Sequence, residues 1–213
     1  MFEENFFSLS PVNFFEISLK VPKISSDTWK EEITHKKTRL PDTSWLLGER
    51  QPPDIHLGWS EEGLYLFAHI AGRFDQPVFP HLTEGDSFEV FIDTRDRKQG
   101  SFNTKFCHHF YFLPQAVDGH MKGEITRFRT EDAHPLANPE EIELEVHASP
   151  LEGKLKIFLP ASLLTGWNPA EFDRLGFSWR LNHRFSAPQH FSAKTDEYTL
   201  EQEPSLWTSC KLC

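Results

Sequence analysis

Two adjacent histidines, His108 and His109, stand in the segment TKFCHHFYFLP (Thr104–Pro114), directly after Cys107. Histidine and cysteine supply metal ligands, and histidine also serves as a general acid or base. The aromatic residues around the pair are typical of a β-strand. Four interpretations are open for these histidines: metal ligands, catalytic groups, sugar contacts or packed core residues.

Side-chain alternation in a strand separates the two histidines. His108 shares one face with Phe110, whereas His109 shares the opposite face with Cys107 and Tyr111. The two rings are therefore not expected to bind one metal ion together. We predict that His108 is a hydrogen-bonded core residue and that His109 is the better candidate to face a ligand.

Three candidate strands carry polar side chains at even spacing, so the members of each pair share a face. The pairs are Glu89 and Asp93, His109 and Tyr111, and Arg180 and Asn182. A sugar site needs this mixture, because carboxylates accept hydrogen bonds from hydroxyl groups, Arg and Asn donate them, and an aromatic ring supplies a flat apolar surface. Alternation does not reveal whether the strands are adjacent. An outer face held by cross-strand Arg–Glu pairs is therefore an equal alternative.

Catalytic chemistry has less support. The sequence contains no GxSxG, HExxH, P-loop or GxGxxG motif. Glu89 and Asp93 would lie about 13 Å apart at roughly 3.3 Å per residue, beyond the roughly 5–10 Å between glycosidase carboxylates. We therefore expect no catalytic residue, and a glycoside-acting hydrolase is the least favoured alternative.

Two further segments contain residues of metal-ligand type. DTRDRKQG (Asp93–Gly100) offers oxygen ligands of the kind that calcium takes, but a turn stabilised by its Asp side chains explains the same residues. The terminal CKLC has CxxC spacing without the second pair that completes a four-cysteine zinc site. No metal is assigned from the sequence.

Composition limits the partners and the location. The chain of 213 residues has a formal net charge of −10, which argues against a nucleic-acid partner because such binding rests on clustered Lys and Arg. No run approaches the roughly 18 apolar residues of a membrane span. Three cysteines cannot all pair within one chain, and the acidic start MFEEN is unlike a secretory signal. We expect reduced cysteines, a cytoplasmic location and no membrane partner; a protein partner stays open.

Period-two alternation predicts the fold. It recurs in six segments, NFFEISLKV, GLYLFAHIA, DSFEVFID, EIELEVHA, GKLKIFLP and GFSWRLNHR. Turn signals lie between them, and only PASLLTGW (Pro160–Trp167) has a helical pattern. Strands without long intervening helices favour two packed antiparallel sheets. We predict an all-β fold with one short helical segment, forming a single domain over residues 1–213, with irregular stretches at Ser25–Pro53 and Ala187–Pro204.

The segments DIHLGWSEEGLYLFAHI and EGDSFEVFIDTRD resemble the family 9 carbohydrate-binding modules and their DOMON-like relatives. In these domains a W-x-x-x-G-L-Y-L strand precedes a G-D-S-x-E-x-F-I-D strand. LGFSWRLNHR and EPSLWTSCKL are similar to their final segments. The resemblance covers Asp54 to Leu212 and implies an antiparallel β-sandwich of jelly-roll type. It also implies sugar binding without catalysis, by stacking tryptophans and polar side chains.

The resemblance places Glu89 at the acidic position of the E-x-F-I-D strand and Asn182 at the asparagine of the late strand. The chain departs from the family at FCHHFYFLP, where a sugar-contacting basic residue is expected. The stacking tryptophans are not clearly placed: Trp45, Trp59 and Trp207 stand near turns, where a ring is often half exposed. Each of these rings either meets a ligand or closes one end of the sandwich.

Haem ligation by Met and His occurs among DOMON relatives. The present chain has only Met1 and Met121, so we expect no cofactor. The leading hypothesis is non-catalytic binding of a carbohydrate or related small polar ligand. Its predicted ligand-binding residues are Glu89, His109, Tyr111, Arg180 and Asn182. The second hypothesis is a structural or protein-interaction β-sandwich without a small ligand.

Overall fold

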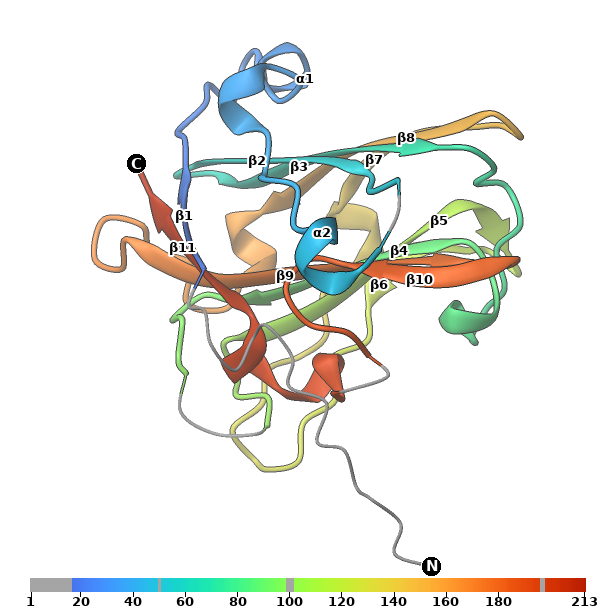
Figure 1. Ribbon diagram of the computed structural model, residues 1–213. Helices are drawn as coiled ribbons and strands as arrows, with labels where there is room; N and C mark the ends of the chain where they lie inside the picture. Colours follow the sequence, from blue (N-terminus) through green and yellow to red (C-terminus); the bar gives the residue numbers. More distant parts are fainter. Residues whose placement is uncertain (1–16, 50, 99–101, 196–197) are drawn as a thin grey trace, which may run out of the picture.

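The computed structural model describes residues 17–49, 51–98, 102–195 and 198–213, which form two packed β-sheets (Figure 1). The larger sheet has the order β1-β11-β9-β4-β5-β6, and β10 also pairs with β9. Its strands are β1 (Ser18–Val21), β4 (Ser87–Asp93), β5 (Cys107–Val117), β6 (His120–Glu124), β9 (Arg174–His183), β10 (Ser186–His190) and β11 (Thr208–Leu212). The smaller sheet has the order β2-β3-β8-β7, with β2 (Asp54–Ser60), β3 (Gly63–Ala71), β7 (Glu143–Ala148) and β8 (Glu152–Pro160).

The described strand pairs are antiparallel except for β1 with β11, which is parallel. This arrangement confirms the predicted antiparallel β-sandwich. The first predicted strand is described only from its C-terminal part, Ser18–Val21, and Phe15 lies outside the described residues. The jelly-roll winding and a single domain over residues 1–213 stay predictions.

The hydrophobic core lies between the two sheets and contains the apolar residues that alternation assigned to it. β4 contributes Phe88, Val90 and Ile92, which are fully buried. The side chains that face them come mainly from β3 and β8 of the smaller sheet, namely Leu64, Leu66, Ala68, Ile70, Leu155, Ile157 and Leu159. β9, the neighbour of β4 in the larger sheet, adds Phe177, Trp179 and Leu181 on the same side as the β4 residues. Flat aromatic and branched side chains pack well on a pleated surface, and this explains where much of the phenylalanine excess goes.

The helical content is larger than the sequence predicted. Pro160–Trp167 forms only the single 3₁₀ turn η5 (Ala161–Leu163), while Ser25–Pro53, predicted to be irregular, contains α1 (Trp29–Glu32) and α2 (Ser44–Leu47). The other 3₁₀ turns are η2 (Lys36–Thr38), η3 (Leu82–Glu84), η4 (Pro139–Glu141), η6 (Leu200–Gln202) and η7 (Pro204–Leu206). Such short helices depend on tertiary packing rather than on propensity. No helix in the described part of the chain is long and apolar enough to cross a membrane.

β10 lies mostly in the stretch Ala187–Pro204, where the sequence predicted an irregular loop. Pro188 argues against a strand because proline cannot donate a ladder hydrogen bond. β10 tolerates it because, among the described strands, this one pairs with β9 alone and its register shifts between Ser186 and Gln189. An edge position and a register shift are properties of the assembled sheet, so the prediction of a loop was wrong here.

Candidate ligand-binding site

Four of the five predicted ligand-binding residues meet on the outer face of the larger sheet, the face that points away from the smaller sheet. β9, β4 and β5 are neighbours, and Glu89 lies opposite Arg180 on one side and Tyr111 on the other. Alternation alone did not establish this adjacency. We call Glu89, His109, Arg180 and Asn182 the Glu89 cluster.

Both carboxylate oxygens of Glu89 are hydrogen-bonded. One accepts from Nε of Arg180 at 2.8 Å and from Nδ2 of Asn182 at 2.5 Å. The other accepts from Nη2 of Arg180 at 2.9 Å and from Nε2 of His109 at 2.6 Å. The Glu89 side chain is 1% exposed. Four donors therefore satisfy a buried anion, and the two-point contact with Arg180 is of the strong, charge-assisted kind.

The ionisation of the Glu89 cluster follows from these contacts. Burial by itself raises the pKa of Glu89, but the hydrogen bond and charge of His109 and the charge of Arg180 outweigh it and lower the pKa to about 2. Burial opposes the charge of Arg180 as well, yet the attraction of Glu89 leaves the pKa of Arg180 raised. Both partners are therefore charged at neutral pH.

A segment near the C-terminus covers the Glu89 cluster; we call residues 191–195 and 198–207 the cover. Its residues Ala193, Leu200 and Trp207 pack with Phe91 and Cys107 of the outer face. Figure 1 shows the orange-to-red segment with its 3₁₀ turns lying beneath the larger sheet, on the side opposite the smaller one. The cluster is therefore closed from solvent in this conformation.

The contact between the cover and the charged cluster is loose. The carboxylate of Glu201 lies 3.5 Å from Nη1 of Arg180, and the Glu201 side chain is 31% exposed. The backbone of the same residue is held separately, since Nδ2 of Asn103 donates to the Glu201 carbonyl at 2.9 Å. The Glu201 side chain is thus able to leave Arg180 while its backbone stays in place.

Within the described part of the chain, one polar atom of the Glu89 cluster has no hydrogen-bond partner. Nδ2 of Asn182 donates to Oγ of Ser87 at 2.9 Å as well as to Glu89, but Oδ1 of Asn182 is buried and meets no donor among the described residues. A buried acceptor in this state costs about 1–3 kcal/mol. A hydroxyl group that donates to Oδ1 would remove this cost.

Tyr111 is the predicted site residue that lies apart from the hydrogen-bonded set. Its ring packs with Leu82 and Leu113 and lies 5.3 Å, centroid to centroid, from Phe79. Burial raises the pKa of Tyr111. The residue supplies an apolar wall beside Glu89, its cross-strand partner.

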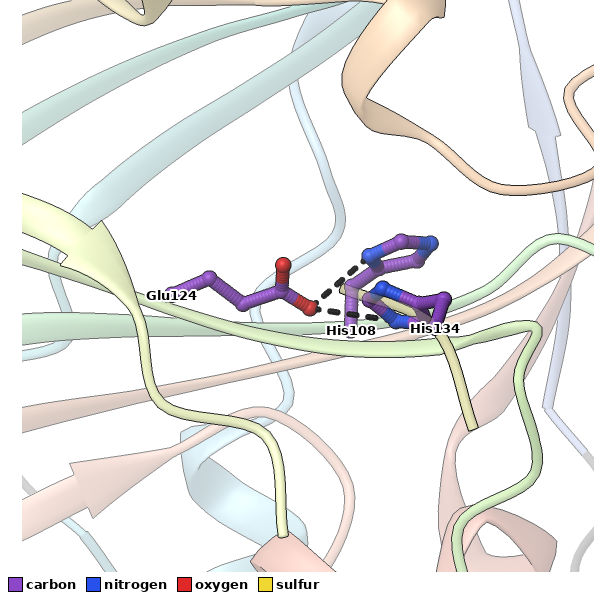
Figure 2. Close-up of side chains that lie close together, drawn as sticks. All are labelled: His108, Glu124 and His134. Atoms are coloured by element: carbon purple, nitrogen blue, oxygen red, sulfur yellow. Dashed lines mark hydrogen bonds and ion pairs between the residues drawn. The ribbon is translucent and has the colours of Figure 1, made fainter. Parts of the chain in front are cut away.

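His108 belongs to a second cluster on the inner side of β5, together with Glu124 and His134 (Figure 2). Nδ1 of His108 lies 2.9 Å from the Glu124 carboxylate, and Nε2 of His134 lies 3.4 Å from it. The side chains of His108 and Glu124 are fully buried. The prediction of a hydrogen-bonded core histidine is confirmed, as is the separation of the two adjacent histidines. We call these three residues the Glu124 cluster.

The Glu124 cluster has the residue types of a zinc site, with ligand atoms within 4.8 Å of one another. Its hydrogen bonds argue against a metal. The backbone N–H of Thr165 donates to Nε2 of His108 at 3.0 Å, so the ring proton sits on Nδ1, which faces Glu124. A metal at Nδ1 needs the opposite tautomer, whose Nε2–H would point at the N–H of Thr165. Burial also lowers the pKa of His108, which favours the neutral ring.

The Glu124 cluster instead attaches the segment after β6 to the sandwich. The second carboxylate oxygen of Glu124 accepts from the backbone N–H of Ala137 at 2.7 Å, and Oγ1 of Thr126 donates to the first at 2.6 Å. Nε2 of His134 also lies 3.1 Å from the carbonyl oxygen of Cys107. Glu124 and His134 were not singled out from the sequence, because neither stands in a motif with His108.

The remaining sequence candidates have structural explanations. The Asp93 carboxylate accepts from the backbone N–H groups of Arg95 at 2.9 Å and Arg97 at 2.6 Å, which supports the turn over the calcium loop. The three cysteines are free, with Cys107 and Cys210 buried and Cys213 exposed. Two of the turn-proximal tryptophans are buried, Trp59 and Trp207, whereas Trp45 is 74% exposed.

Comparisons with known proteins agree on the fold. The chain is similar to a family 9 carbohydrate-binding module from Caldicellulosiruptor kristjanssonii, solved in complex with cellotriose, with a TM-score of 0.64 and 16% identity over 92% of this chain and 93% of that one. A structure of a family 9 module from the same organism with glucose gives a TM-score of 0.62 and 15% identity over 93% and 96% of the two chains. No family model matches the sequence, and no curated protein matches it. The likeness shows that the chain has the fold of these modules.

Proposed function

We propose that the protein is a non-catalytic carbohydrate-binding domain whose sugar binds at the Glu89 cluster. The observation that carries the proposal is the buried Oδ1 of Asn182, which meets no donor among the described residues, in a cluster whose charged side chains satisfy one another. The fold supports it, since the similar modules were solved with cellotriose and glucose. A sugar hydroxyl donating to Oδ1 would complete the set.

Access to the cluster requires a change in the cover. When the Glu201 side chain turns away from Arg180, Nη1 becomes free to donate to a second sugar hydroxyl. The bidentate contact of Arg180 with Glu89 uses Nε and Nη2 and stays intact. Tyr111 and Phe79 would then border the sugar with aromatic surface. In this proposal Glu89 and His109 hold the donors in place.

Calorimetric titration with glucose, cellobiose and cellotriose tests the proposal. We expect saturable binding that Asn182→Ala weakens by about tenfold, the loss of roughly one hydrogen bond made to a buried group. Glu201→Gln should tighten binding, because it weakens the contact that competes for Arg180. Arg174→Ala, at the exposed start of the same strand, is the matched control and should bind like wild type. No saturable binding by wild type or Glu201→Gln would contradict the proposal.

The hydrogen bonds within the Glu89 cluster favour a second candidate function. The charged groups of the Glu89 cluster satisfy each other beneath a packed cover, as expected for a structural or protein-interaction β-sandwich that keeps the fold without a ligand. The hydrolase alternative needs two close carboxylates, or a histidine–carboxylate pair, open to solvent in a cleft. The histidine–carboxylate pairs of the Glu89 and Glu124 clusters are buried, so these two clusters do not favour it. A cytoplasmic location stays a prediction.

A further inference from the structure

An open pocket of about 600 Å³ lies along the β10 edge of the sandwich and is lined by none of the residues of the Glu89 cluster. We call it the β10 pocket. Its walls come from the hairpin β9–β10, from the chain just after α2, from the end of β3 with Arg73, and from Lys194 and Thr195 of the cover. The volume falls within the roughly 300–1,000 Å³ typical of small-molecule sites. The pocket is therefore large enough for a small ligand without any movement of the cover.

The carboxylates of two acidic residues at the β10 pocket already form hydrogen bonds with groups in its walls. The Glu49 carboxylate accepts from the backbone N–H of His190 at 3.0 Å and lies 2.8 Å from its Nδ1. The Asp86 carboxylate accepts from three backbone N–H groups, those of Asp75, Gln76 and Arg184, at 2.8–2.9 Å. These contacts join the loops around the pocket and pre-form its shape. The N–H groups also offset part of the negative charge of these carboxylates, which reduces the electrostatic repulsion that an anion meets in the pocket.

The remaining lining points to a ligand with an apolar ring face and a negative charge. Phe185 is 74% exposed at the pocket, after the end of β9. Lys194, half-buried, lines the same pocket. Arg73 is paired with Asp75 at 2.6 Å, so Lys194 is the basic group best placed to meet an incoming carboxylate. Ser186 adds a hydroxyl group that suits a polyhydroxylated ligand, while the Thr195 hydroxyl, which lies 2.8 Å from Nε2 of His190, keeps its oxygen as an acceptor.

We propose that the β10 pocket is a second binding site, specific for a sugar unit that carries a carboxylate, a uronic acid. The apolar face of the sugar ring stacks on Phe185 and its carboxylate pairs with Lys194. The saccharide class rests on the proposed function of the domain, whereas the pocket, its aromatic residue and its lysine stand independently of it. The two sites differ in charge preference: the Glu89 cluster takes neutral hydroxyl groups, and the β10 pocket takes an anion.

Titrations with sodium D-glucuronate, sodium D-galacturonate and digalacturonate, followed by backbone NMR shifts and calorimetry, test this site. D-glucose is the neutral comparator. We expect at least one uronate to bind, with shifts at Phe185 and Lys194, and weakening by about tenfold in Phe185→Ala and in Lys194→Ala. Trp45→Ala removes a ring of equal exposure, 74%, outside the pocket lining and should bind like wild type. Added salt should weaken uronate binding in wild type more than in Lys194→Ala.

The outcomes separate this inference from the proposed function. Uronate binding that survives Asn182→Ala but is lost in Phe185→Ala supports an independent second site. Uronate binding that is lost in Asn182→Ala and kept in both pocket variants overturns the second site and leaves the Glu89 site standing. Binding of glucose without binding of any uronate also overturns the second site and leaves the Glu89 site standing. Uronate binding at the pocket without any glucose binding supports this inference while the proposed function at the Glu89 cluster fails.

Discussion

The Glu89 cluster and the Glu124 cluster contain the same elementary pair, a buried glutamate bonded to a histidine, on opposite faces of β5. In the outer cluster an arginine makes a two-point contact with the carboxylate, so a buried anion meets a buried cation. In the inner cluster the donors are a neutral histidine, a hydroxyl group and a backbone amide. The inner cluster closes a loop, whereas the outer one leaves an acceptor unpaired.

This difference shows that the partners of a histidine–glutamate pair determine its use. The N–H of Thr165 fixes the tautomer of His108 and leaves the ring no free lone pair for a metal or a ligand. The outer cluster has the reverse character, because Oδ1 of Asn182 and Nη1 of Arg180 can accept or give further hydrogen bonds. Of the two clusters, the outer one therefore retains more capacity for further hydrogen bonds.

The largest loss of unfolding free energy is expected from breaking the ion pair between Arg180 and Glu89 in the outer cluster. Arg180→Met leaves Glu89 buried without the two-point contact and the charge of its arginine partner, which should lower the unfolding free energy by about 3–5 kcal/mol. The double variant Glu89→Leu/Arg180→Met should recover most of this loss, since it removes both charges. Urea denaturation of the two variants and of Arg174→Met, an exposed arginine of the same strand, makes the comparison. Equal stability of Arg180→Met and wild type would contradict the account.

A smaller effect is expected from breaking the inner cluster. Glu124→Leu leaves the donors of His108, Thr126 and Ala137 without their acceptor, but burial lowers the pKa of His108 and favours its neutral ring, so this histidine is not left as an unpaired buried charge. We expect a loss of about 1–3 kcal/mol and faster proteolysis within residues 127–136. A loss of unfolding free energy greater than that of Arg180→Met would contradict the expectation that the outer cluster contributes more to stability than the inner one.

Acid should weaken the two clusters at different pH values. Burial lowers the pKa of His108 in the folded chain. Below about pH 6.5 the unfolded chain therefore binds a proton at this histidine more readily than the folded chain does, and the unfolding free energy falls as the pH falls. The pKa of Glu89 is lowered to about 2, so its contribution is complete above about pH 4.3 and is lost toward about pH 2. Urea unfolding across this range should show a smaller loss for His108→Asn in the upper window and for Glu89→Gln in the lower one. Unchanged pH profiles in both variants would contradict these assignments.

The smallest expected effect is that of zinc. The His108 tautomer blocks ligation at Nδ1, so a thermal melt with added zinc should match one with a chelator. His134→Ala is the control, and its melting temperature should respond to zinc no more than that of wild type. A zinc-dependent rise in melting temperature that His134→Ala abolishes would show that the inner cluster binds metal after all.

The sequence predicted the strands and the faces of their side chains well, because both depend on local alternation. The same-face pairing of Arg180 with Asn182 and the burial of His108 follow from that pattern. The contacts across the sheet do not, since strand order and register come from the assembled fold. Glu201 and His134 reach their clusters from segments distant in sequence, and no local signal identifies them. β10 was missed because Pro188 is acceptable only at an edge.

The most direct test of the central claim is an NMR titration with glucose and cellotriose that follows the side-chain N–H signals of Arg180 and Asn182. The account predicts that both signals shift saturably with one dissociation constant, while the ring signals of His108 on the inner face of β5 stay in place. Glu201→Gln should show the same shifts at lower sugar concentration. Unchanged Arg180 and Asn182 signals at saturating sugar would contradict a binding site at the Glu89 cluster.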